Sequence, residues 1–324
     1  MDVDLLSSLG CPDCNSALKV QNIFLKRGKR LVNAIVSCAC SDYPILDGIL
    51  YLSHGKTKSL AYAYLKEAKP EKEWIPFFFL RFPSRFSLLL LRIFSKVNFF
   101  SSFSFPFFIR LFIFLGVYEK GWGFYQLGRE KDRSFLPAKH FSRLVKKNSK
   151  ILDAGCASGA FLSTVGKRAN ARNIAAIDTS LPGLYLAKKY FSPRANFIYL
   201  DLNDKLPFKD SHFDYVFSND AFHYVKQQKR LAGELRRIIS NQGTLVLTNL
   251  HNKYYSKEFK GQSDYPQTPE AYISLFGQKG TILFSEYPLM KISTNQAKKL
   301  KKFTLLYSLS NHFQRLYSST SHEW

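Results

Sequence analysis

Apolar residues follow strand-like and helix-like spacings in turn over the second half of the chain. The first strand-like run opens Lys150–Leu162, a segment that continues into a glycine turn and the start of a helix; the others are Asn173–Asp178, Asn196–Leu202, Phe213–Asp220 and Gly243–Leu250. Helix-like stretches separate these runs, and such alternation is typical of a parallel α/β domain. The pattern therefore predicts a parallel sheet whose ligands bind at the carboxyl edge of the strands.

Composition divides the 324 residues into three regions, which we expect at 1–56, 57–135 and 136–324. The first bears cysteines and two strand-like runs, Val32–Val36 and Ile45–Leu52. The second begins as a helix near Ser59–Lys69 and then becomes rich in phenylalanine. The third is the α/β domain, near whose end the run Lys298–Lys302 has the pattern of a solvated helix face.

The Phe-rich region has an unusual charge pattern. Residues 74–118 contain 14 of the 30 phenylalanines and no acidic residue. The longest charge-free run, Val97–Ile109, is 13 residues long and contains Pro106, whereas a membrane span needs about 20 apolar residues. Two interpretations stay open: a segment that lies on a membrane surface, and a helical lid whose arginines extend to solvent.

The charge of the whole chain points to partners rather than to a fold. The formal net charge is +23, and a basic surface attracts RNA, DNA or anionic membranes. The alternative is a basic surface that only solvent contacts. The chain opens with Met1-Asp2-Val3-Asp4, which does not resemble a secretory signal, so we expect a cytoplasmic, reducing environment.

Four of the five cysteines form two close pairs, Cys11 with Cys14 and Cys38 with Cys40. In a reducing compartment, paired cysteines bind metal more often than they form disulfides. Zinc takes four thiolate or imidazole ligands, and two tight turns supply two ligands each. The spacing predicts a structural Zn²⁺ without an open coordination position, although His54 offers an alternative to one cysteine.

The same region resembles a known module. Cys11-Pro12-Asp13-Cys14, the second cysteine pair and Tyr43–Ile49 (YPILDGI) resemble the Trm112-type zinc ribbon over residues 5–52. Such modules are joined to, or are partners of, methyltransferases that act on RNA, proteins and small molecules. The resemblance implies a class of enzyme and leaves its substrate open.

A glycine turn follows the first strand of the α/β domain, in Lys150–Leu162 (KILDAGCASGAFL). Gly155 and Gly159 allow a ligand to approach the backbone closely. A dinucleotide fingerprint would need glycine at Ala157 and Ala160, and a phosphate-binding loop would need Lys-Ser/Thr after the turn. Neither is present, so the turn predicts another nucleotide-like ligand.

Acidic residues end the following strands. Asp178 ends the second strand and is placed to accept both ribose hydroxyls of a nucleoside, and Asp201 ends the third, where it can accept from an adenine amine. This array resembles the class I S-adenosylmethionine (SAM)-dependent methyltransferases, type 11-like, over residues 120–290. The resemblance implies a Rossmann-like seven-stranded sheet with helices on both faces. It implies that SAM is bound by Asp153, Gly155, Cys156, Ala157, Gly159, Asp178, Thr179, Asp201, Leu202 and Asn219.

Candidate catalytic groups lie after the fourth and fifth strands. They are Asp220, His223, Tyr224 and His251. A general base is needed only if the acceptor is protonated at neutral pH. Each histidine also has a purely structural interpretation, and its place at the reactive edge is what favours a catalytic role.

Three functions remain open. The first is methylation of a small-molecule or lipid-like acceptor, with peripheral membrane contact through residues 74–118. The second is methylation of rRNA or tRNA, with the zinc module and the basic surface binding the RNA. The third is a non-catalytic partner protein with a SAM fold. Ser218–Phe222 lacks the Asn/Asp-Pro-Pro-aromatic motif of enzymes that methylate nucleobase amino groups, which favours the first; the oligomeric state is left open.

Overall fold

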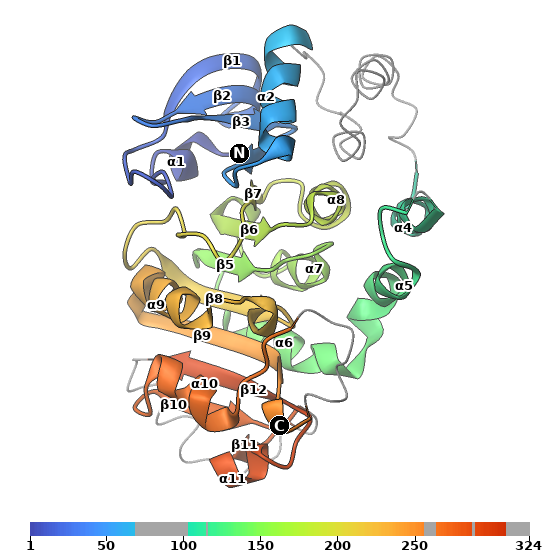
Figure 1. Ribbon diagram of the computed structural model, residues 1–324, viewed down its shortest axis with the longest axis vertical. Coiled ribbons are helices and arrows are strands. Elements are labelled where there is room, and N and C mark those ends of the chain that lie inside the picture. The colour runs from blue at the N-terminus through green and yellow to red at the C-terminus, as the bar shows by residue number, and fades with distance from the viewer. Residues whose placement is uncertain (69–102, 115, 256–263, 287–288, 309–324) are drawn as a thin grey trace. The chain divides into compact units, whose positions relative to one another are not determined.

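Strands with helices packed against them make up both units into which the computed structural model divides (Figure 1). The structure describes residues 1–68, 103–114, 116–255, 264–286 and 289–308. Unit 1 comprises Met1–Arg129, Ala157–Ala160 and Ala175–Pro207, and unit 2 comprises Glu130–Cys156, Phe161–Ile174 and Phe208–Trp324. The α/β fold class is confirmed.

The strands of unit 1 join the cysteine-bearing region to the second and third predicted strands. The order is β1 (Lys19–Arg27), β2 (Arg30–Ser37), β3 (Asp42–Leu46), β4 (Ile49–Tyr51), β7 (Asn196–Tyr199) and β6 (Ile174–Asp178). Neighbours from β1 to β4 are antiparallel, and β4–β7 and β7–β6 are parallel. The predicted run Ile45–Leu52 is thus two strands, because Asp47 and Gly48 turn the chain with φ of 49° and 72°.

Helices cover parts of this sheet. In sequence order they are α1 (Val3–Leu6), α2 (Lys56–Ala68), α4 (Phe105–Phe114), α5 (Lys120–Gly128) and α8 (Leu181–Leu186). Helix α2 packs on β2 and β3, and α8 packs on β7. Helix α4 contacts α8 through Phe108 and Tyr185, whose ring centroids are 6.1 Å apart. Both of these side chains are buried, so the described part of the Phe-rich region contributes to the core of unit 1.

Unit 2 contains the remaining strands of the predicted sheet. The order is β5 (Ile151–Ala154), β8 (Phe213–Asn219), β9 (Ile239–His251), β12 (Lys302–Ser308), β10 (Thr281–Phe284) and β11 (Lys291–Ile292). Strands β5, β8 and β9 are parallel, whereas β12 is antiparallel to both β9 and β10. The helices are α6 (Leu136–Phe141), α7 (Ala160–Val165), α9 (Gln228–Ile238), α10 (Pro269–Phe276) and α11 (Thr294–Ala297). Of the seven strands predicted for the methyltransferase fold, unit 1 contains two, β6 and β7, and unit 2 contains five, β5, β8, β9, β12 and β10.

The basic run near the end of the chain differs from its prediction. The helix face expected at Lys298–Lys302 is wrong: α11 ends at Ala297, and Lys302 already begins β12, because apolar residues after Lys302 pair with β9. Residues 74–102, on which most of the membrane-surface interpretation rests, lie outside the described residues. No helix within the described part of the chain is long and apolar enough to span a bilayer.

A buried ion pair within unit 1 leads to a stability prediction. Lys188 Nζ lies 3.1 Å from Asp47 Oδ1, and the two side chains are 14% and 8% exposed. Replacing Lys188 by Met removes the cation that pairs with a buried carboxylate, so we expect a loss of up to about 3–5 kcal/mol in the free energy of unfolding. Urea unfolding followed by circular dichroism measures it.

The matched control is Lys19→Met on exposed β1, which we expect to change stability by no more than about 0.5 kcal/mol. Adding Asp47→Asn to Lys188→Met should recover part of the loss, since the uncompensated charge is then gone. Equal stability of Lys188→Met and the control would contradict the ion-pair interpretation.

Candidate active site

The carboxylate of Asp178 holds the glycine turn within unit 1. Its Oδ2 accepts a hydrogen bond from the Ala157 amide at 2.7 Å, and its Oδ1 accepts one from the Ser180 amide at 2.6 Å. Each carboxylate oxygen has two lone pairs, so both oxygens keep acceptor capacity. Burial raises the pKa of this carboxyl above its ordinary value, while the amide hydrogen bonds from Ser180 and Ala157 oppose that rise.

Close packing explains why glycine stands at position 159. A Cβ there would lie 2.7 Å from the Cβ of Ala187, and the backbone of Gly159 has a φ of 90°. Gly183 is equally confined, because a Cβ would lie 2.7 Å from the Ala157 carbonyl oxygen. Ala157 itself has a φ of 44°, in the left-handed region that favours glycine. Ala157 therefore adopts a backbone conformation at the turn that glycine would adopt without strain.

The other predicted cofactor residues of unit 1 have different surroundings. Asp201 accepts hydrogen bonds from Asn203 through Oδ1, and its amide binds Ser53 Oγ at 2.8 Å. Leu202 is buried and Thr179 is exposed. Asp201 is thus held from both sides, by its own turn and by Ser53, two residues after β4.

Unit 2 carries the first part of the turn. Asp153 is buried at the end of β5, opposite Phe217 of β8, and Gly155 has a φ of 86°. Cys156 is also buried. Asn219 ends β8, and its Oδ1 accepts a hydrogen bond from Thr248 at 3.2 Å. Because β5 and β8 are parallel, the turn and the residues after β8 lie at the same edge of the unit 2 sheet.

Three of the four predicted catalytic residues cluster at that edge. Asp220 Oδ1 lies 3.8 Å from His223 Nε2 and 3.9 Å from His251 Nε2. The two imidazole rings stack with centroids 3.7 Å apart, and Tyr224 packs against His223 at 4.3 Å. Asp220 has a φ of 58°, a strained backbone of the kind that accumulates at functional sites.

Sequence reasoning missed two members of this cluster. Asp264 Oδ2 lies 2.7 Å from His251 Nδ1, and Lys302 Nζ lies 3.8 Å from Asp220 Oδ1. Asp264 lies between β9 and α10 with no motif around it. Lys302 belongs to a basic run whose pattern suggested a solvated face. Lys302 reaches the cluster because β12 pairs with β9, and Asp264 reaches it through the course of the chain before α10.

Burial dominates the electrostatics of the two histidines. It lowers the pKa of His223 well below its ordinary value, and the neighbouring His251 lowers it further. Burial also lowers the pKa of His251, while the hydrogen bond with Asp264 acts in the opposite direction. Both imidazoles are consequently neutral at neutral pH.

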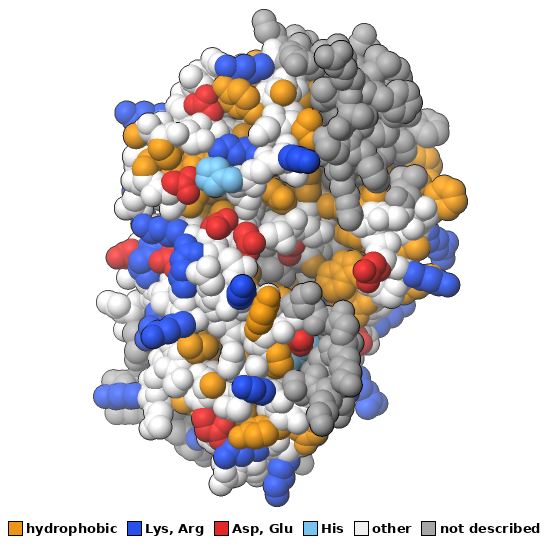
Figure 2. Space-filling model, in the orientation of Figure 1, with side chains coloured by type: hydrophobic (Ala, Val, Ile, Leu, Met, Phe, Trp, Pro, Cys, Tyr) orange, Lys and Arg blue, Asp and Glu red, His pale blue; other side chains and the backbone are white. Residues whose placement is uncertain are grey.

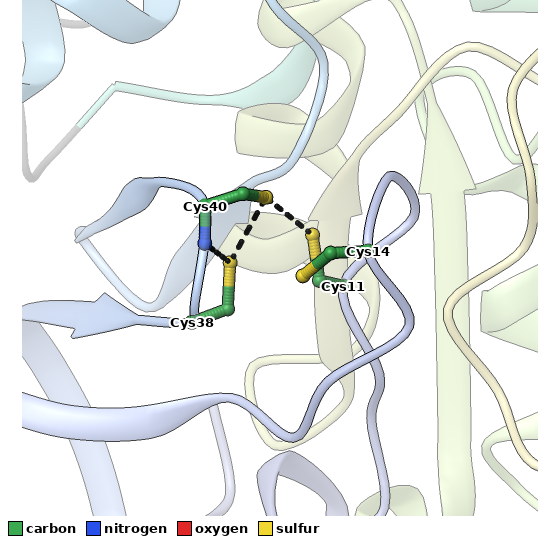
Figure 3. Close-up of side chains that lie close together, drawn as sticks. All are labelled: Cys11, Cys14, Cys38 and Cys40. Atoms are coloured by element: carbon green, nitrogen blue, oxygen red, sulfur yellow. Dashed lines mark hydrogen bonds between the residues drawn. The ribbon is translucent and has the colours of Figure 1, made fainter.

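The four paired cysteines of unit 1 converge (Figure 3). All four sulfur atoms lie within 4.8 Å of one another, with 3.6 Å between Cys11 and Cys40 and 3.4 Å between Cys38 and Cys40. Zn–S bonds of about 2.3 Å in a tetrahedron require S–S separations of this size. The Ser16 hydroxyl and amide lower the pKa of Cys14 to about 6, which favours a thiolate.

His54 is not part of this sulfur cluster. Its Nε2 lies 2.7 Å from Asp13 Oδ2, and the same oxygen accepts a hydrogen bond from Tyr43. Tyr43 is in turn 3.0 Å from Cys11 Sγ. The histidine therefore contacts the carboxylate beside the cysteines, and the four thiols are the group placed so that they could hold a metal ion.

Part of the chain matches a known family. Residues 152–247 match the family model described as a methyltransferase domain. Residues 152–247 form a methyltransferase domain. Methyltransferases of this family use SAM as the methyl donor. The matched segment begins in β5 and ends in β9, so it includes the glycine turn and Asp178.

Individual relatives resemble parts of the chain. Malonyl-[acyl-carrier protein] O-methyltransferase 1 of Ilyobacter polytropus is 32% identical over 112 residues, which are 34% of this chain and 41% of the relative. A sterol 24-C-methyltransferase of Gibberella zeae is 26% identical over 140 residues, 39% of this chain and 37% of the relative. The chain thus spans about two fifths of the length of these curated relatives.

Solved structures resemble the chain as well. One is a chain of the complex between the Haloferax volcanii Trm112 methyltransferase activator and a methyltransferase, with a TM-score of 0.46, 21% identity, and coverage of 57% of this chain and 95% of that one. Another is a SAM-dependent methyltransferase from Mesorhizobium loti, with a TM-score of 0.42, 19% identity, and coverage of 54% and 96%.

The packing at Gly159 of the methyltransferase domain gives a direct test. Gly159→Ala combines a positive φ with a Cβ 2.7 Å from Ala187, so we expect a loss of about 1–3 kcal/mol in stability. Gly233→Ala in α9 is the control, because a Cβ there meets nothing within 4 Å. Alanine should stabilise that helix by roughly 0.5–1 kcal/mol. Thermal unfolding separates the two, and equal shifts of Tm would contradict the packing argument.

Proposed function

We propose that this chain transfers a methyl group from SAM to a small-molecule or lipid-like acceptor. The observation that carries the proposal is the Asp178 carboxylate, which holds the glycine turn through Ala157 and keeps lone pairs on both oxygens. A carboxylate in this position is suited to the two ribose hydroxyls of a nucleoside. When bound, SAM supplies an electrophilic methyl group on a sulfonium.

The residues proposed to hold SAM are the set implied by the resemblance to class I methyltransferases. Asp178 binds the ribose, Asp201 and Leu202 contact the adenine, and the backbone around Gly155 and Gly159 approaches the methionine part. The remaining members of this proposed set are Asp153, Cys156, Ala157, Thr179 and Asn219. Acceptor binding is assigned to Asp220, His223, Tyr224 and His251, after β8 and β9.

The acceptor class is supported by the relatives and by the surface. The names of the relatives specify a malonyl group on a carrier protein and a sterol, neither of them a nucleic acid. On the face drawn in Figure 2, Lys and Arg side chains are interspersed with acidic ones and form no continuous band among the described residues. Phe114 of α4 is 84% exposed, which suits peripheral contact with a lipid surface. RNA methylation is the second outcome to test, because of the charge of +23.

We further propose that Cys11, Cys14, Cys38 and Cys40 bind a structural Zn²⁺. Their sulfur atoms already lie within 4.8 Å of one another. Four thiolates complete the coordination of zinc, so the ion would stabilise the fold and take no part in the reaction.

The decisive experiment is methyl transfer from radiolabelled SAM into separated lipid, small-molecule and RNA extracts. Label in the lipid or small-molecule fraction is expected. Label in RNA, with an affinity that falls steeply with salt, would replace this proposal by the second function. Absence of SAM binding in calorimetry would leave only a non-catalytic partner protein.

Asp178→Ala provides the matched test of the cofactor site. It removes a charge-assisted hydrogen-bond acceptor, so we expect SAM binding to weaken by roughly 1–3 kcal/mol, or about 5- to 150-fold in Kd. Asp210→Ala, an exposed carboxylate in unit 2, is the control and should bind SAM as the wild-type protein does. Unchanged affinity of Asp178→Ala would remove the central support of the proposal.

Zinc has its own test. Cys38→Ser should abolish stoichiometric zinc, measured by mass spectrometry of the metal, and lower the Tm, because unit 1 loses a metal-closed turn. Cys156→Ser, in unit 2 and outside the cluster, should keep one zinc per chain. Full zinc content in Cys38→Ser would rule out the four-cysteine site.

A further inference from the structure

In the buried cluster at the ends of β8 and β9, the contact with Asp264 determines which nitrogen of His251 carries the proton. His251 Nδ1 is 2.7 Å from Asp264 Oδ2, and a carboxylate can only accept from that nitrogen, so the hydrogen-bond network assigns the proton to Nδ1. In the neutral ring, Nε2 then carries the lone pair. That nitrogen lies on the side of Asp220, 3.9 Å from its Oδ1.

The members of the cluster differ in their exposure to solvent. The side chains of His223 and His251 are 0% and 2% exposed, whereas those of Asp220 and Lys302 are 12% and 27% exposed. Of the two carboxylates Asp220 is the more exposed, since Asp264 is 7% exposed, and the Oδ1 atom of Asp220 that faces the histidines is buried. An oxygen–nitrogen distance of 3.9 Å exceeds a hydrogen bond, but such contacts between catalytic groups often shorten only when substrate binds.

The cluster also has the composition of a metal site, and its geometry argues against one. The two imidazole planes are only 21° apart, with centroids separated by 3.7 Å. Ring lone pairs lie in the ring plane, so near-parallel stacked rings cannot both point to one ion about 2.0–2.1 Å away. The Lys302 ammonium, 3.8 Å from Asp220, already supplies a cation. A role in proton transfer therefore fits this arrangement better than a role in metal binding.

The net charge of the cluster restricts the chemical class of the methyl acceptor. Among the described members of this cluster, with both imidazoles neutral, the carboxylates of Asp220 and Asp264 outnumber the ammonium of Lys302. An acceptor carboxylate would meet this net negative charge in a poorly solvated place and would be repelled. It would also need no base. A neutral acceptor with a removable proton suits the cluster on both counts.

On the basis of the proposed function, we infer that the methyl acceptor is a hydroxyl group, and that Asp220, His251 and Asp264 receive its proton. The hydroxyl oxygen forms the bond to the methyl carbon as the carbon–sulfur bond breaks, and the electron pair of that bond stays on sulfur. The hydroxyl proton passes through Asp220 to Nε2 of His251. Asp264 then stabilises the imidazolium, so Asp220 is the catalytic residue and Asp264 a positioning residue.

The chemistry of the labelled product tests the acceptor class even while the acceptor itself is unidentified. The probe is the full chain with methyl-tritiated SAM and a total lipid and small-molecule extract. A methyl ether resists mild alkali and releases methyl iodide in hot hydriodic acid, and this is the expected result. Release of labelled methanol by mild alkali would identify a methyl ester, hence a carboxylate acceptor, and would overturn the inference. Failure to label any fraction would instead count against the proposed function itself.

Variants test the assignment of roles. Asp264→Asn is nearly isosteric and should preserve the fold while removing the charge that stabilises the imidazolium. We expect Asp264→Asn and His251→Gln to lower the transfer rate roughly 100-fold and to leave the Kd for SAM within about threefold. His140→Gln, outside the cluster, is the matched control and should retain full activity. Wild-type rates in both cluster variants would overturn the assignment.

The pH profile separates a proton acceptor from a structural histidine. The groups that face His251 are Asp220 after β8, His223 and Tyr224 in the following turn, Asp264 before α10, and Lys302 of β12. Because burial keeps the pKa of His251 below the ordinary 6.5, the wild-type rate should rise with pH through a value below 6.5 and be constant above it. His251→Gln should lose this rise. Metal analysis gives the opposite outcome its own signature. If Cys38→Ser still bound one metal ion per chain, and His223→Ala lost that ion, the cluster would be a metal site and the proposed proton transfer would be refuted.

Discussion

A hydrogen bond from the Ala157 amide to the Asp178 carboxylate holds the conformation of the glycine turn. Ala157 has a positive φ, which costs a residue with a side chain about 1–3 kcal/mol, and a charge-assisted bond of 2.7 Å offsets that cost. The glycine turn also places Gly159 in close contact with Ala187, which follows α8. The same carboxylate is thus needed for the shape of the turn and for the nucleoside proposed to bind there.

Strand positions followed closely from the hydrophobic pattern, whereas strand partners did not. The runs ending at Asp178 and Asn219 contain enough apolar residues to mark β6 and β8 without further information. The pairing of β4 with β7 joins Ile49 to Phe197, residues far apart in the sequence, and no local pattern specifies such a contact. The division of Ile45–Leu52 into two strands was hidden for another reason: Asp47-Gly48 is a two-residue turn inside an otherwise apolar run.

The candidate site shows the same limit at the level of side chains. Strand ends predicted Asp220, His223 and His251 together, because the ends of parallel strands meet at one sheet edge. Asp264 and Lys302 reach the cluster from a loop and from an antiparallel strand, so spacing along the chain carries no signal for them. Asp264 nevertheless determines which nitrogen of His251 carries the proton, and Lys302 places a cation 3.8 Å from Asp220.

The cysteine-bearing strands and the acid-bearing strands of unit 1 share one hydrogen-bonded sheet. The amides of Leu52 and Ser53 both bind the carbonyl oxygen of Tyr199, at 3.0 and 3.2 Å, and Ser53 Oγ accepts from the Asp201 amide. Closing the two cysteine turns therefore stabilises the sheet that presents Asp178 and Asp201. The proposed metal would therefore act by stabilising the fold of unit 1, which is the role expected of a coordination site without an open position.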